Sequence, residues 1–110
     1  MNSSPLGARS WERHKCGTEG LFLVGTGEVR ARMLDASRGG FKLRFEHSDA
    51  VTAVLSPLPR DVKVSTDGYS NFLATVMWAK DGLAGCRFYQ HLSLDDVVQL
   101  MTRQFKLNLT

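Results

Sequence analysis

The stretch VRARMLDASRGGFKLRF, residues 29–45, contains two runs in which apolar and charged residues alternate. In residues 29–34 the apolar side chains alternate with arginines, and in residues 41–45 phenylalanine and leucine alternate with Lys42 and Arg44. Alternation of this kind places one set of side chains on the buried face of a strand. The connection DASRGG contains the small and polar residues that turns use. The stretch therefore predicts a β-hairpin with one apolar face.

Further short runs on either side have the same character. Residues 21–24, 61–66, 72–79 and 83–89 are apolar or alternating, and residues typical of turns separate them. With the first hairpin, they predict roughly five to seven short strands. Such a series is typical of a small antiparallel barrel or sandwich. We therefore expect an all-β fold.

The end of the chain changes period. In SLDDVVQLMTRQFKLNL, residues 93–109, apolar residues recur every three or four positions, as on one face of an amphipathic helix. Ser93 suits the N-cap, and Asp95 and Asp96 suit the first turn, where the helix dipole favours negative charge. We therefore expect a C-terminal helix over residues 93–106 that packs on the barrel.

The length of 110 residues is typical of one domain, residues 1–110. Residues 1–19 show no clear periodicity and contain proline and glycine, so we expect a flexible N-terminal segment there. The strand-like runs place the barrel within residues 20–90.

Composition narrows the function classes. The net charge of +3 favours an anionic ligand but is too small to indicate nucleic acid by itself. Cys16 and Cys86 share no metal-binding spacing, and neither a secretory leader nor a membrane-spanning stretch is visible, so we expect a cytoplasmic protein with reduced thiols. The three histidines are scattered, and no Ser/His/Asp arrangement, acid pair or HExxH occurs. We therefore expect no enzyme, no metal site and no bound cofactor.

The first of two notable motifs is RSWER, in which Arg9 and Arg13 lie four residues apart. The spacing also suits a solvated helical face, but the nearby proline and glycines favour a loop. Arginine is the side chain suited to bidentate contacts with phosphate and guanine, and its plane stacks on bases. An anion-binding loop is the functional interpretation.

The second motif is LDASRGG, residues 34–40. Asp35 and Ser37 can cap backbone groups of a hairpin turn, and a glycine there can supply positive φ. The same carboxylate can accept hydrogen bonds from a guanine edge, the hydroxyl can donate or accept, and Gly40 lets a flat ligand approach the backbone. Both interpretations remain open at this point.

R-x-x-x-R followed by D-x-S-x-x-G is the signature of PilZ domains, and the chain resembles that family. ATVMWAKDGLAGCRF, residues 74–88, is similar to the closing hairpin of the family, which carries a tryptophan and a glycine before the last strand. Residues 90–100 and 107–109 resemble the helical end of stand-alone members. The resemblance therefore spans nearly the whole chain.

The resemblance implies a six-stranded antiparallel β-barrel with a C-terminal helix, acting as a bacterial receptor for cyclic di-GMP. It assigns this ligand to Arg9, Arg13, Asp35, Ser37, Gly40 and Trp78. The two arginines would clamp phosphates and guanines, the acid and hydroxyl would hydrogen-bond a guanine, and the glycine would leave room for its ring. The tryptophan would lie beside the ligand or, as an alternative, in the core. Ala8 stands where some members carry a further arginine associated with a stacked ligand dimer, which favours one ligand per domain.

The route from binding to signal is also an expectation. Residues 1–17 would wrap over the nucleotide and change the surface offered to a downstream protein partner, in the control of motility, exopolysaccharide or biofilm. We expect a monomer, with no DNA or RNA partner and no membrane span. Two alternatives stay open: an adaptor of the same family that binds no nucleotide, and a small nucleic-acid-binding barrel, which would need a broad basic face with exposed aromatics.

Overall fold

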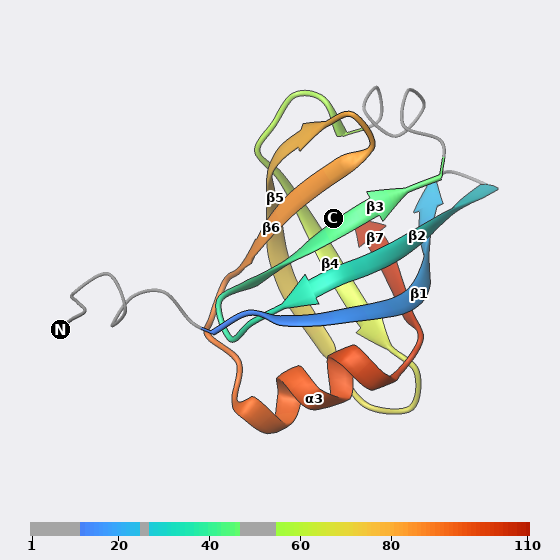
Figure 1. Cartoon of the computed structure of the whole chain (residues 1–110). Helices are drawn as coiled ribbons and strands as arrows, with labels where there is room; N and C mark the ends of the chain where they lie inside the picture. Colours follow the sequence, from blue (N-terminus) through green and yellow to red (C-terminus); the bar gives the residue numbers. More distant parts are fainter. Residues whose placement is uncertain (1–11, 25–26, 47–54) are drawn as a thin grey trace, which may run out of the picture.

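The computed structural model describes residues 12–24, 27–46 and 55–110. Within these ranges seven strands form a closed barrel in the order β1-β2-β3-β6-β5-β4-β7, and helix α3 lies across one end of it (Figure 1). The bounds are β1 His14–Val24, β2 Gly27–Ala36, β3 Gly40–Phe45, β4 Arg60–Thr66, β5 Asn71–Lys80, β6 Leu83–Phe88, α3 Leu94–Thr102 and β7 Phe105–Leu109.

The all-β barrel with one C-terminal helix is confirmed, but the expected six strands in purely antiparallel pairing are corrected. Strand β7 is the additional strand among the described residues, and it pairs parallel to β1, with Phe22 opposite Leu107. The other neighbouring strands pair antiparallel. Since β7 also pairs with β4, it is the strand that closes the barrel.

Helix α3 ends earlier than its apolar spacing predicts. It spans Leu94–Thr102 rather than 93–106, because residues 105–109 alternate between buried and more exposed positions and join the sheet. Phe105 fits both patterns, since it lies four residues after Met101 and also begins an alternating run. Its side chain is fully buried in the core as part of β7, and this burial favours the strand.

The start of α3 is as predicted. The Asp96 N–H donates to Ser93 Oγ at 3.1 Å, and the Asp96 carboxylate accepts from the Ser93 N–H at 3.4 Å, which is a complete capping box. Val97 and Leu100 face the core, whereas Val98 is exposed. The buried face is therefore narrower than the spacing indicates.

The barrel begins inside the segment expected to be flexible. Strand β1 starts at His14, and its pairing with β2 begins there, so the barrel starts before residue 20. Its side chains alternate in burial, but Cys16, Gly17 and Thr18 are too small to give a clear hydrophobic period in the sequence. Residues 1–11, which include Arg9, lie outside the described residues.

The inward faces of the strands meet in one core. The alternation around residues 29–45 correctly predicts Met33, Phe41 and Leu43 as core residues, each no more than 1% exposed. Phe22 and Phe45 pack with ring centroids 5.6 Å apart and link β1 to β3 through the core. This core holds the β2–β3 turn, with its acid and hydroxyl, at one end of the barrel.

Candidate ligand-binding site

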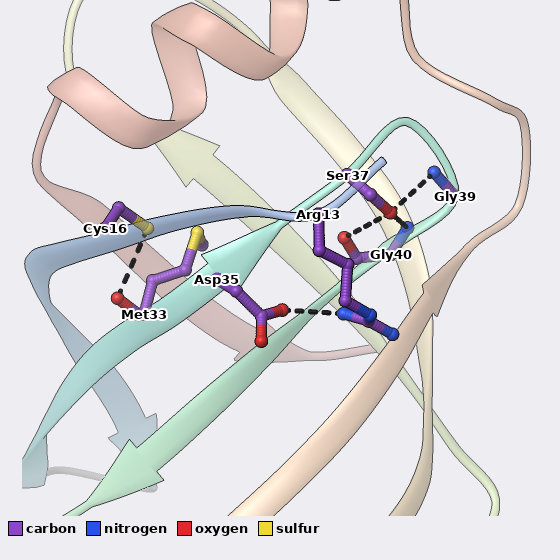
Figure 2. A network of polar contacts seen from close by, with 7 residues as sticks. All are labelled: Arg13, Cys16, Met33, Asp35, Ser37, Gly39 and Gly40. Atoms are coloured by element: carbon purple, nitrogen blue, oxygen red, sulfur yellow. Dashed lines mark hydrogen bonds and ion pairs between the residues drawn. The ribbon is translucent and has the colours of Figure 1, made fainter. Parts of the chain in front are cut away.

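Arg13 and Asp35 meet at the end of the barrel where β1 begins and β2 ends (Figure 2). Arg13 Nη1 lies 2.6 Å from Asp35 Oδ1, although 22 residues separate the two along the chain. The pairing of β1 with β2 places Lys15 opposite Asp35 and so delivers Arg13 to the same edge of the turn. The structure therefore brings together one residue from each sequence motif.

The hydroxyl of Ser37 closes the turn between β2 and β3. Ser37 Oγ accepts from the N–H groups of Gly39 and Gly40, each at 3.2 Å, and donates to the Gly40 carbonyl at 3.3 Å (Figure 2). The residue is only 5% exposed. The turn interpretation is confirmed for Ser37, and a contact with a ligand stays a prediction.

Gly40 is required by the close approach of β6. A Cβ atom at this position would lie 2.2 Å from the Cys86 carbonyl oxygen and 3.3 Å from Arg87 Cα. Both neighbours are backbone atoms of a paired strand, so neither can move without opening the sheet. Glycine is therefore required at this position by the packing of β3 against β6. That it also leaves room for a ligand ring stays a prediction.

The turn is fastened to the chain that leads into α3. Arg38 Nε donates to the Leu92 carbonyl at 2.7 Å, and the Leu92 N–H donates to the Arg38 carbonyl at 2.8 Å. The Phe88 N–H donates to the Gly39 carbonyl at 2.9 Å. Sequence reasoning missed this role of Arg38, because no local pattern marks a partner 54 residues away.

Trp78 lies on the outer surface of the barrel rather than in the core. A bulge in β5 between Val76 and Trp78 turns both Met77 and Trp78 outward, and Trp78 is 43% exposed. Its indole covers Gly85, where a Cβ atom would lie 2.1 Å from Nε1. The core alternative for this residue is therefore wrong, and its position beside a ligand stays a prediction.

The strand register places Asp35 and Trp78 in one lateral row. Asp35 of β2 is paired with Lys42 of β3, Lys42 with Gly85 of β6, and Gly85 with Trp78 of β5. Laterally paired residues point to the same face of a sheet. With adjacent strands about 4.8 Å apart, the row extends about 14 Å from the acid to the tryptophan. Sequence reasoning missed Lys42. Alternation predicts that its side chain points outward, but not that it lies between Asp35 and Trp78.

The charges around this row favour an anion. Lys15, Lys42 and Arg87 are placed by the register next to Asp35, Gly85 and Gly40, respectively, and Arg13 adds a fourth cation. Asp35 is the acid that the row itself contains. Beneath the row, burial raises the pKa of the Cys86 thiol, which keeps it protonated.

Comparison with known families matches the model described as PilZ domain to residues 8–105 of the chain. The chain belongs to the PilZ domain family. PilZ domains form a family that binds cyclic di-GMP, and they are receptor or adaptor domains rather than enzymes. The match includes both motifs and most of the barrel. Neither the curated proteins nor the solved structures gave a match.

Two further observations describe this PilZ domain. In residues 12–24, 27–46 and 55–110, no group of three or more His, Cys, Asp or Glu side chains is placed to hold a metal ion. Over the same described ranges, no helix has the length and apolar character needed to cross a membrane.

Proposed function

We propose that this PilZ domain is a cytoplasmic receptor that binds cyclic di-GMP on the outer face of β2, β3, β6 and β5. The observation that carries the proposal is the meeting of Arg13 and Asp35 at 2.6 Å beside the β2–β3 turn. Cyclic di-GMP combines two anionic phosphates with two guanines. A guanidinium and a carboxylate at one edge suit the phosphate and the guanine, respectively.

Each residue of the site has a chemical role in this proposal. The Asp35 carboxylate accepts from the N1–H and N2–H₂ edge of one guanine, and Arg13 turns to a phosphate or stacks on the base. Lys42, in the middle of the row, offsets phosphate charge, and the exposed ring of Trp78 offers a flat surface at the far end. Ser37 and Gly40 hold the turn in shape, and Arg9 supplies a second guanidinium.

The interaction strengths support binding at useful concentrations. The exposed Arg13–Asp35 pair contributes only about 0–1 kcal/mol, so its exchange for ligand contacts costs little. Each charge-assisted hydrogen bond contributes roughly 1.5–3 kcal/mol net, and stacking roughly 1–3 kcal/mol per base. A micromolar Kd corresponds to about 8.2 kcal/mol. We expect affinity in that range or tighter, decreasing with added salt.

The relay of the signal is part of the same proposal. The segment that precedes β1, with Arg9, closes over the bound nucleotide and changes the surface offered to a protein partner. The hydrogen bonds between the turn and residues 88–92 give a second route, since this stretch leads directly into α3. Control of motility, exopolysaccharide or biofilm is the class of output proposed, with the receptor acting as a monomer.

Isothermal titration with cyclic di-GMP tests the proposal. Wild type is compared with Arg13→Ala and with Lys63→Ala, which removes a cation from the outer face of β4. We expect one nucleotide per chain, at least about tenfold weaker binding for Arg13→Ala, and unchanged binding for Lys63→Ala. Equal affinity of Arg13→Ala and wild type would refute the assignment of residues.

A protein–protein adaptor that binds no nucleotide is the second candidate. Leu73, Met77 and Tyr89 are exposed. The Tyr89 N–H donates to the Leu73 carbonyl at 3.0 Å, so Leu73 and Tyr89 lie on neighbouring segments of the chain. Aromatic residues and methionine are enriched at protein interfaces. Thermal melting separates the two candidates, because a nucleotide that binds the native state raises Tm and a non-ligand does not.

A further inference from the structure

A second cationic surface lies on β2 and β3, away from their turn. We call it the arginine face, and it consists of Arg30 and Arg32 on β2 and Arg44 on β3. Arg32 and Arg44 are paired directly opposite each other, and Arg30 lies two residues from Arg32 on the same outer face. The three side chains, with Glu19 and Glu46, line a hollow of about 230 Å³.

The arginines of this face do not stabilise the pairing of β2 with β3. Like charges directly opposite in an antiparallel pair destabilise it. Arg32 is partly compensated, since its Nη2 lies 3.1 Å from Glu19 Oε2. Arg30 and Arg44 are exposed, and within the described part of the chain neither forms an ion pair. Two cations beside a hollow therefore remain available to an external anion.

We propose that the arginine face docks an acidic segment of a partner protein. Arginine pairs with carboxylates in a bidentate geometry and is enriched at protein interfaces. Glu19 and Glu46 line the same hollow, so the cations here are interspersed with acids, whereas a nucleic acid or a lipid surface presents closely spaced phosphates that favour an unbroken basic patch. Single carboxylates of a protein segment can reach Arg30 and Arg44 and still avoid these two acids.

The location separates this surface from the nucleotide site. Arg32 lies three residues before Asp35, or roughly 10 Å along β2, and Arg44 lies two residues after Lys42, or roughly 7 Å along β3, so the arginine face is next to the nucleotide row but does not include it. Both surfaces share β2 and β3, so a partner and a nucleotide can occupy the two regions of the same hairpin together. The inference goes beyond the proposed function, because an adaptor without nucleotide would use the arginine face equally.

A titration followed by NMR of the uniformly ¹⁵N-labelled full chain tests the docking. The probe is an acidic peptide whose glutamates are separated by glycine and serine, and the same peptide with lysine in place of each glutamate is the control ligand. We expect shifts at Arg30, Arg32 and Arg44 with the acidic peptide alone. Binding should weaken at least about tenfold in the double variant Arg30→Gln/Arg44→Gln.

A matched double variant controls for net charge. Lys63→Gln/Lys106→Gln removes the same charge from the outer faces of β4 and β7, and it should bind the acidic peptide as wild type does. Equal losses in both double variants would reduce the effect to net charge and overturn the proposal. Tighter binding of the arginine face to a single-stranded oligonucleotide, or to phosphatidylglycerol vesicles, would overturn it in favour of a phosphate surface.

Melting and nucleotide titration complete the test. Because Arg44→Gln removes a like-charge contact with Arg32, we expect an unchanged or higher Tm. A lower Tm would show that the arginine holds the sheet together and would overturn the proposal. The Arg30→Gln/Arg44→Gln variant should lose far less affinity for cyclic di-GMP than for the acidic peptide, because the arginines act on the nucleotide only through screened charge. Failure at one surface is therefore distinguishable from failure at the other.

Discussion

The Arg13 guanidinium and the Asp35 carboxylate form an ion pair at 2.6 Å in which the arginine is 59% exposed and the acid only 15%. The acid is therefore held in place by the sheet, while the arginine reaches it from outside. An incoming guanine would take over a carboxylate that already has a partner, and the displaced guanidinium would lie next to the phosphates. Recognition at this site is thus an exchange of partners.

The first prediction concerns Asp35→Ala. Loss of an exposed ion pair should lower the free energy of unfolding by no more than about 1 kcal/mol. Loss of the guanine acceptor should weaken cyclic di-GMP binding at least about tenfold. Melting and isothermal titration measure the two effects. Glu19→Ala is the control, since it removes the acid of the exposed Arg32–Glu19 pair, and it should leave nucleotide binding intact.

A second prediction follows from the contact between β3 and β6. Gly40→Ala places a Cβ atom against the Cys86 carbonyl, and the resulting overpacking should lower the free energy of unfolding by about 1–3 kcal/mol or more. For a domain of this size that corresponds to roughly 5–20 °C in Tm. Gly17→Ala is the control, because its Cβ would meet only the Arg32 side chain, at 3.5 Å. Equal melting temperatures for the two variants would contradict the structural role of Gly40.

The third prediction uses the indole that covers Gly85. In Gly85→Ala the new Cβ would overlap Trp78 Nε1, so the ring must swing further into solvent. We expect the tryptophan emission to shift to longer wavelength. The measurement needs a Trp11→Phe background, because the chain has two tryptophans. An unshifted spectrum would show that the indole does not rest on the glycine.

The fourth prediction concerns acid stability. Tyr69 Oη donates to Asp96 Oδ1 at 2.8 Å, and this hydrogen bond lowers the pKa of Asp96 and raises the pKa of Tyr69. A depressed carboxyl pKa gives stability that is present above the unfolded value of about 3.9 and is lost as pH falls through the folded pKa. Below about pH 4, Tm should therefore fall less steeply in Tyr69→Phe than in wild type.

Melting curves recorded across the acidic range measure this effect. Tyr89→Phe is the matched control, since the Tyr89 hydroxyl interacts with Asp61 and not with Asp96. In Tyr89→Phe, Tm should fall below about pH 4 as steeply as it does in wild type. Parallel acid limbs for wild type and Tyr69→Phe would show that the hydrogen bond contributes nothing to acid stability.

Local alternation predicts most of the sheet. It finds β2, β3, β4, β5 and β6, because each of these strands has one buried face and the connections between them carry glycine or proline. Alternation fails at the start of the first strand, β1, and at the last strand, β7. His14–Glu19 alternates in burial without alternating strongly in hydrophobicity, and Phe105 satisfies helix and strand periods at once. The parallel pairing of β1 with β7 is a contact between distant segments, which no local pattern contains.

At the site, too, local patterns predict some features and miss others. The two motifs predict Arg13 and Asp35 as candidates, and pairing of β1 with β2 brings them together. The sequence does not show that the Ser37 hydroxyl is already used by two backbone N–H groups. It also does not show that a bulge turns Trp78 outward, since strict alternation after Val76 would point residue 78 into the core. Bulges and turn hydrogen bonds are three-dimensional features that residue type alone leaves open.

The parallel pairing of Phe105–Leu109 with β1 has a consequence for biosynthesis. During translation the barrel cannot close until its last strand has left the ribosome, because β1 and β4 wait for the same partner. Until then both present unpaired backbone groups, which are templates for association with other chains. A nascent chain that stops after Thr102 would carry the complete nucleotide row and would still be prone to aggregate.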